Sequence, residues 1–220
     1  KEPDKSIAVL PFENMNKDST QDYFSNGIAE DILNHLVKIA DLKVKSRTST
    51  LQYKGTTKTM SEIGEELNVS NVLEGSVRRV GDKVRIVVQL IDTKTDTHLW
   101  SETYDRDLKD VLSLQSEIAM EIARALKATL TLSEKKNITR EESTTVSAYD
   151  YYLRARQILN EFEFFAFASP DKRQVETAMS LLDQSLRLDP NFAQAIALKG
   201  KAWFLNRWFG VSEKTWTDSS

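Results

Sequence analysis

Two runs of ten residues that alternate apolar and polar side chains constrain the fold of this chain more than any other feature. The runs are NVLEGSVRRV (71–80) and KVRIVVQLID (83–92), and Gly81-Asp82 separates them. Alternation with period two is typical of a strand with one buried face, and a two-residue connection containing glycine is typical of a tight hairpin. The turn TKTDT then leads into HLWSETYDRDL (98–108), which alternates as well. The sequence therefore predicts three consecutive antiparallel strands.

The segment before the hairpin predicts a pair of parallel strands. SIAVLPF (6–12) is a short apolar run closed by proline, a polar loop follows over 13–21, and LKVKS (42–46) alternates. Residues 22–42 carry apolar side chains at helical spacing, among them Ile28 and Ile32. A strand, a helix and a strand joined by short connections form a right-handed crossover with parallel strands. The predicted sheet is therefore mixed, and the fold class of this part is α/β.

Two further helices are expected to flank this sheet. Residues 61–67 (SEIGEEL) predict a short helix with Ser61 as its N-cap, and residues 108–132 predict a long amphipathic helix that covers one face of the sheet. The polar stretch 134–147 lacks periodicity and is predicted to be a linker. We therefore expect an α/β domain over 1–133 and an all-α segment over 148–220.

The all-α segment carries a pattern typical of tetratricopeptide repeats. Ala178, Leu182, Ser185 and Pro190 have the spacing that ends such a repeat, where small residues let two helices approach closely. The first-helix pattern occurs at residues 148–158 and again at 193–203, an offset of about 45 residues where the repeat has about 34. We expect one repeat with an insertion, followed by a truncated one.

Residues that depart from the repeat pattern are candidates for binding a partner. The insertion NEFEFFAFASPDK (160–172) is rich in aromatic residues, and Phe164 and Phe165 could form an exposed apolar patch. The alternative that we favour is a lengthened helix whose phenylalanines pack on its neighbour. Arg154 and Lys199 are basic where leucine is usual, so they could meet the acidic residues of a peptide in the repeat groove, or be plain surface charges.

Several motifs in a fixed order connect the chain with a known family. They are KSIAVLPFENM, YFSNGIAEDILNHL, VLEGSVRRVGDKVRIVVQLID, HLWSETYDRDLKDV and QSEIA. Together they resemble the TolB amino-terminal-like domain of bacterial signalling proteins, which tetratricopeptide repeats follow. The resemblance implies a place downstream of an output module, such as a class III adenylate cyclase domain or a CadC-type winged-helix transcription regulator. It supplies no catalytic residues.

Composition and motifs argue against several kinds of site. The chain has no cysteine, which excludes disulfides and thiolate sites, and its net charge of −3 gives no basic face for direct nucleic-acid contact. The glycines lack the spacing of a phosphate loop, and His35 and His98 lack the spacing of metal ligands. We therefore predict no cofactor, no metal and no catalytic residue, and do not expect this chain to be an enzyme.

The stretch 98–108 leaves open whether the sheet has a binding face. If Trp100 and Tyr104 shared the mixed face of the hairpin, they would meet Arg78, Arg85 or Gln89, and aromatic and arginine contacts dominate interfaces. The alternative that we favour covers both faces of the sheet. In that arrangement Trp100 packs under a helix, and the helices of residues 22–42 and 61–67 lie opposite the long helix.

Asp105 and Asp107 are expected to be acids at the start of the long helix. Lys1 is not an initiator methionine, so we expect the chain to be part of a longer protein. Contact with a membrane would then come only through an anchor outside this sequence, and the family slightly favours the periplasmic side.

The sequence as a whole predicts a non-catalytic regulatory module. It would bind a protein or peptide partner, in the repeat groove or on the sheet, and act on an output domain outside this chain. A small ligand and a homodimer remain open. The alternatives are a structural scaffold with no sensing role and the regulatory end of an adenylate cyclase.

Overall fold

The computed structural model describes residues 4–16, 18–139, 145–164 and 172–217, with the backbone alone for 161–164 and 208–217. The chain divides into two compact units, Lys1–Glu141 and Glu142–Ser220. Within the described residues, no helix combines the length and the apolar character that a membrane crossing requires.

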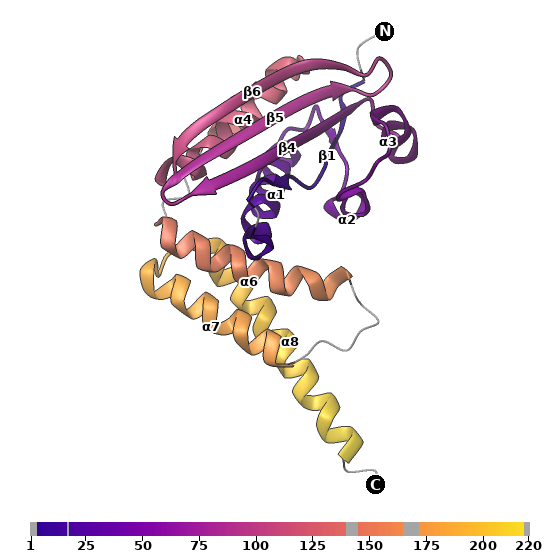
Figure 1. Ribbon diagram of the computed structural model, residues 1–220. Helices are drawn as coiled ribbons and strands as arrows, with labels where there is room; N and C mark the ends of the chain where they lie inside the picture. Colours follow the sequence, from indigo (N-terminus) through magenta and orange to yellow (C-terminus); the bar gives the residue numbers. More distant parts are fainter. Residues whose placement is uncertain (1–3, 17, 140–144, 165–171, 218–220) are drawn as a thin grey trace. The chain divides into compact units, whose positions relative to one another are not determined.

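A mixed sheet forms the centre of the first unit, as the sequence predicts (Figure 1). The strand order is β3-β1-β4-β5-β6, with β1 parallel to β3 and β4, and with β4, β5 and β6 antiparallel. A short strand in the predicted loop, β2, also pairs with β4, beyond the end of β1. The strands are β1 Ser6–Val9, β2 Glu13–Asn14, β3 Lys43–Val44, β4 Asn71–Val80, β5 Lys83–Asp92 and β6 Thr97–Asp107.

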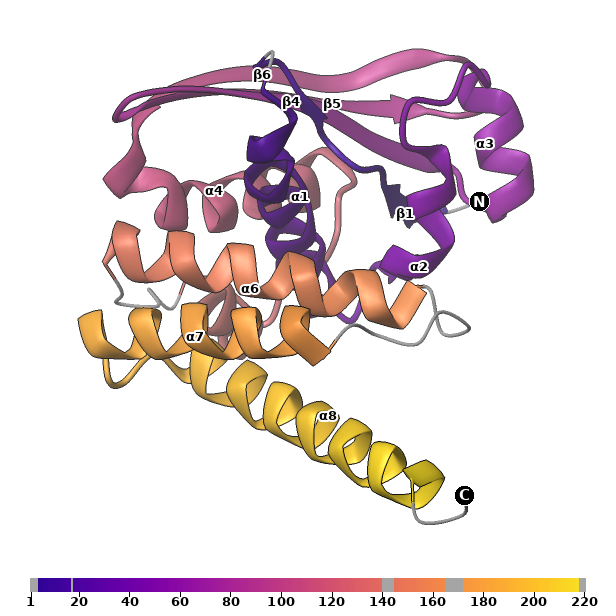
Figure 2. The same cartoon turned by 60° about the horizontal axis from the view of Figure 1, so that its bottom comes forward.

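The helices α1 and α4 lie together on one face of this sheet (Figure 2). The Gln115 amide of α4 donates a hydrogen bond to Asp31 of α1 at 3.3 Å. The prediction that the helix of residues 22–42 would lie opposite the long helix is therefore wrong. The helices of this unit are α1 Asp22–Val37, α2 Arg47–Thr50, α3 Met60–Leu67, α4 Val111–Ala125 and α5 Leu132–Ile138.

Helix α3 packs on the opposite face, near the start of β4. Its residues Ile63 and Leu67 share an apolar cluster with Ala8 of β1 and Val72 of β4. The N-cap is Thr59 rather than the predicted Ser61, because Thr59 and Glu62 form a reciprocal capping box. Helix α3 covers only this end of the face, so the expectation that both faces are covered fails for the rest of the hairpin.

The polar stretch after the long helix is partly ordered. The long helix ends at Ala125, and Lys127 adopts a left-handed backbone with φ 51°. Helix α5 then begins with a second capping box, between Thr131 and Glu134. The Glu134 carboxylate also accepts a hydrogen bond from the Ala40 backbone amide at 2.9 Å, which fastens α5 to the end of α1.

The stability of the first unit is expected to fall in mild acid because of His35. Burial, with help from Lys38 and against Asp31, lowers the pKa of this imidazole from 6.5 to about 4, and its Nδ1 has no hydrogen-bond partner among the described residues. Between these values the unfolded chain binds the proton more readily, so the free energy of unfolding decreases as pH falls from 6.5 to 4.

Urea unfolding of wild type and His35→Gln at several pH values measures this effect. The difference between the two proteins should change across that window. A pH dependence that survives His35→Gln and disappears in His98→Gln, at an exposed position, would contradict the prediction.

The described residues of the second unit form three helices. Small residues from the predicted repeat pattern are buried between the first two, where the Ser185 hydroxyl donates to the Ala148 carbonyl at 2.7 Å. An all-α segment is thus present, while its assignment as tetratricopeptide repeats stays a prediction. The helices are α6 Val146–Phe164, α7 Lys172–Leu188 and α8 Ala193–Thr217.

Candidate binding surface on the antiparallel strands

The register of the three antiparallel strands assigns each side chain to one of two faces. Residues directly opposite one another share a face, so the pairs Leu90–Trp100 and Ile86–Tyr104 place both aromatic residues with the apolar side chains. We call this the inner face; it is turned toward α1 and α4 and comprises Leu73, Val77, Val84, Ile86, Val88, Leu90, Trp100, Glu102, Tyr104 and Arg106. The other side, the outer face, comprises Glu74, Ser76, Arg78, Val80, Lys83, Arg85, Val87, Gln89, Ser101, Thr103, Asp105 and Asp107.

The hypothesis that Trp100 and Tyr104 contact Arg78, Arg85 or Gln89, which the sequence analysis left open and did not favour, is therefore wrong. Tyr104 is buried, with 5% of its surface exposed, and Trp100 is half-buried. The reason lies in an irregularity of β6: the register shifts between Leu90 and Ile91, which leaves Leu99 without a partner and places His98 opposite Ile91.

Tyr104 lies against the acidic side of α4. Burial, reinforced by Glu117, Glu102 and Glu121, raises the pKa of its phenol to about 12. The Arg106 guanidinium lies 5.5 Å from the centre of the Tyr104 ring and 3.5 Å from the Glu117 carboxylate. The inner face of β6 thus belongs to the core at Tyr104, and Arg106 lies between this ring and the solvent-exposed Glu117.

The outer face carries charged rows at the hairpin end. Arg85 binds Asp105 through two hydrogen bonds, of 2.7 and 2.9 Å, and Lys83 pairs with Asp107. The Arg85 guanidinium lowers the pKa of the Asp105 carboxyl. Asp105 and Asp107 are therefore cross-strand ion-pair partners at the end of β6. The expected position at the helix start is wrong for Asp105, whereas Asp107 is the N-cap residue of the 3-10 turn Leu108–Asp110 that leads into α4, although its side chain makes no capping hydrogen bond.

Arg78 differs from Lys83 and Arg85 on the outer face in having no acidic partner among the described residues. It lies directly opposite Arg85, and its side chain is exposed. None of the described residues forms an ion pair or hydrogen bond with the Arg78 guanidinium. Two like charges opposite one another are unfavourable, and Asp105 offsets only one of them. The surrounding hollow has a volume of about 670 Å³, and Val80, Lys83 and Asp107 also line it.

Gln89 lies farther along the outer face, between Glu74 and Ser101. It is half-buried, as is Glu74, whose pKa is raised chiefly by burial. The outer face thus brings together Arg78, Arg85 and Gln89 from the predicted set. A carboxylate or phosphate of a partner is the group that an exposed guanidinium binds best.

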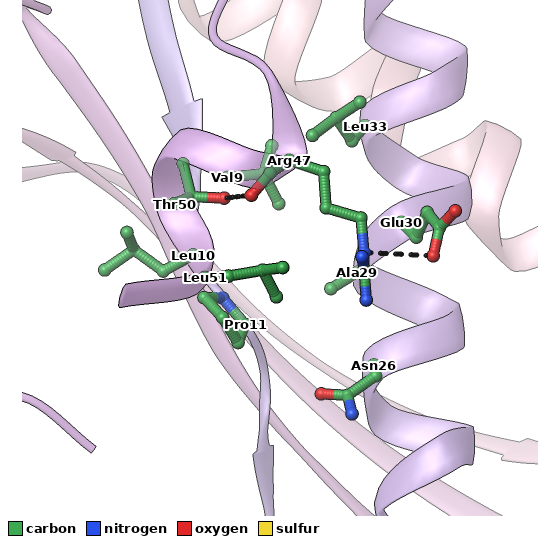
Figure 3. Close-up of a pocket in the computed structure, with 10 residues that line it drawn as sticks. All are labelled: Val9, Leu10, Pro11, Asn26, Ala29, Glu30, Leu33, Arg47, Thr50 and Leu51. Atoms are coloured by element: carbon green, nitrogen blue, oxygen red, sulfur yellow. Dashed lines mark hydrogen bonds and ion pairs between the residues drawn. The ribbon is translucent and has the colours of Figure 1, made fainter. Parts of the chain in front are cut away.

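A second, smaller cavity lies at the carboxyl end of β1 (Figure 3). Arg47 of α2 and Glu30 of α1 form an ion pair of 3.1 Å across it, and the Thr50 hydroxyl donates to the Arg47 carbonyl at 2.9 Å. Ligands often bind at such strand ends in α/β sheets. Its volume of about 20 Å³ holds roughly one water molecule and no metabolite. Sequence reasoning missed this pair because the two residues lie on separate elements.

The candidates in the helical unit are mostly engaged within it. Arg154 pairs with Asp150 one turn earlier at 2.9 Å, and Lys199 pairs with Asp183 at 2.5 Å. Phe164 is the last residue of α6, described by its backbone alone, and Phe165 lies outside the described residues. Across the part of the chain that the structure describes, no three His, Asp or Glu side chains are grouped to hold a metal ion.

The sheet and its helices correspond to a known regulatory domain. The sequence profile of the HilA/YgeH-like transcriptional regulator, second domain, matches residues 3–122, which include all six strands. The chain belongs to this family. The resemblance to regulatory proteins is thus confirmed for the HilA/YgeH-like domain, whereas the repeats that should follow it stay a prediction.

A relative from Rhizobium meliloti (strain 1021) matches beyond the HilA/YgeH-like domain. It is named "Putative adenylate cyclase 3"; it is 38% identical over an alignment of 217 residues, and the match covers 97% of this chain. The chain spans 36% of the length of that relative.

Solved structures resemble part of the chain at low identity. TolB from Acinetobacter baumannii is 16% identical with a TM-score of 0.43, over 56% of this chain and 28% of its own. LpoB of E. coli is 16% identical with a TM-score of 0.36, over 46% of this chain and 55% of its own.

Proposed function

We propose that the chain is the non-catalytic regulatory module of a bacterial signalling protein, which binds a partner and controls an output domain outside this chain. The observation that carries the proposal is membership of a regulator-domain family. The match to a relative named as an adenylate cyclase, of which this chain spans 36%, supports a cyclase as the output. That match extends through the helical unit, whereas the regulator profile ends at residue 122, so we favour a cyclase over a DNA-binding domain.

The outer face is the surface that we assign to the partner. An acidic group of a protein partner would bind Arg78, whose charge has no counterpart within the described residues, with Val80 supplying an exposed apolar contact beside it. We assign the helical unit to tetratricopeptide repeats, on the buried small residues of α6 and α7. Such repeats would continue the binding surface or transmit its state.

Cyclic AMP measurements test the two parts of this proposal separately. The 220-residue chain, incubated with ATP and Mg²⁺ or Mn²⁺, is expected to form no cyclic AMP, and its formation would refute the non-catalytic role. The full-length protein is expected to form cyclic AMP. Its failure to do so would refute the cyclase output but not the regulatory domain.

In the full-length protein, Arg78→Glu is expected to change the rate of cyclic AMP formation at least twofold. The variant reverses the charge of the unpaired guanidinium, while its exposed position predicts a change in stability within about 0.5 kcal/mol. Lys94→Glu is the matched control, since it makes the same charge change at an exposed turn residue outside this hollow. Equal effects of the two variants would argue against the outer face as the partner surface.

A further inference from the structure

Among the residues that the structure describes, strand β6 forms an open edge of the sheet. It ends the strand order, spans eleven residues, and pairs on one side with β5 (Figure 1). The side chains of Ser101, Glu102, Thr103 and Asp105 are exposed. Natural edge strands are usually protected by lysine, proline or a short length. The sequence THLWSETYDRD has neither lysine nor proline. It does carry two inward-pointing charges, Glu102 and Arg106, but these are of opposite sign and can therefore complement one another across an antiparallel pairing.

The backbone groups at this edge can be assigned a direction. The Leu108 amide donates to the Asp82 carbonyl, at 2.8 Å, on the β5 side. Backbone groups alternate in direction along a strand, so the even-numbered residues of the regular part of β6 bond to β5. Ser101, Thr103, Asp105 and Asp107 therefore present their N–H and C=O groups outward. The irregularity at Leu99 lies before this stretch, whose pairing with β5 is regular from Trp100 to Asp107.

We propose that β6 pairs antiparallel with β6 of a second copy of this chain, which joins the two sheets into one. The two-fold axis passes beside Tyr104, so Thr103 lies opposite Asp105 of the second copy and Ser101 opposite its Asp107. Both pairs join outward-directed backbone groups, as an antiparallel ladder requires. The contact is isologous, because each copy contributes the same stretch, and a closed dimer results.

Charge complementarity selects this register. Glu102 and Arg106 share the inner face, and pairing about Tyr104 places Glu102 of each copy opposite Arg106 of the other. The Arg106 side chain is 39% exposed and contacts the Glu117 carboxylate through one nitrogen at 3.5 Å. Its guanidinium can therefore bind an additional carboxylate. An axis beside Glu102 or Asp105 would instead oppose identical acids, which is destabilising. This inference concerns assembly and stands independently of the regulatory role.

A proline substitution at the open edge tests the pairing. Sedimentation velocity of the full chain is expected to show a dimer in the wild type. Thr103→Pro removes one outward N–H and none that bonds to β5, so it should weaken dimerisation at least about tenfold while the circular dichroism spectrum stays native. Thr103→Val, which keeps the N–H, is the matched control and should remain dimeric.

Charge reversal tests the register. Glu102→Arg is expected to weaken dimerisation at least about tenfold, because an arginine at position 102 of each copy would then face Arg106 of the other copy. The double variant, Glu102→Arg with Arg106→Glu, is expected to restore dimerisation. A wild-type chain that stays monomeric at the highest attainable concentration overturns the proposal. If Thr103→Pro remains dimeric, the copies do not pair through the β6 edge. If Glu102→Arg dimerises as strongly as the wild type, the register about Tyr104 is wrong.

Discussion

Gly64→Ala is expected to destabilise the first unit by about 1–3 kcal/mol, although alanine is the better helix former. A Cβ at Gly64 would lie 2.4 Å from the Cβ of Thr93, which is too short for two non-bonded carbon atoms. Thr93 cannot move away, because its backbone amide donates to the Ser70 carbonyl and its carbonyl accepts from the Ser61 hydroxyl. Helix α3 must therefore lift from the sheet.

Gly200→Ala is the matched control for this substitution. It also lies within a helix, α8, but an added Cβ there meets no atom within 4 Å. Helix propensity then predicts a gain of up to about 1 kcal/mol, so the two substitutions should have opposite signs. Hydrogen exchange by mass spectrometry measures each unit separately in the full chain. Equal effects of the two variants, or protected α3 amides in Gly64→Ala, would disprove the contact.

Tyr104→Ala is expected to cost about 3–5 kcal/mol, the range for removing a buried aromatic side chain. The residue lies opposite Ile86 on the inner face and is almost fully buried, so its loss leaves a cavity beneath α4. Urea denaturation, with hydrogen exchange of the β5 and β6 amides, measures the loss.

Two variants separate the core role of Tyr104 from a role at the surface. Tyr104→Phe keeps the ring and should change the free energy of unfolding by less than about 1.5 kcal/mol. Thr103→Ala, at the neighbouring exposed position on the outer face, should change it by about 0.5 kcal/mol or less. A Tyr104→Ala variant of native stability would return this residue to the set of surface candidates.

Local sequence signals predict the strands of the hairpin and the face that α4 covers, because period two and helical spacing report burial directly. The register of β6 was beyond such signals. No glycine marks the irregularity at Leu99, and alternation read without it places His98 on the same face as Trp100. Helix α5 was predictable in principle, since Thr131 and Glu134 have capping-box spacing, but the polar composition of the stretch hid it.

Contacts between distant residues account for the other differences. The position of α3 depends on the approach of Gly64 to Thr93, and nothing in either local stretch reports it. The Arg47–Glu30 ion pair and the unpaired state of Arg78 likewise depend on which elements meet. For the candidate surface, the sequence supplied the residue types, whereas the division between outer and inner face required the register.

The irregularity at Leu99 gives β6 two opposite phases of alternation. Downstream of it, the even-numbered residues lie on the inner face and pack in the core. Upstream of it, the even-numbered His98 lies opposite Ile91 and therefore on the outer face. Sequence variation in relatives should therefore show a change of phase within this one strand. Insertion or deletion of one residue there would exchange the solvent-facing and core-facing side chains of the strand's beginning, while its charged end stayed in place.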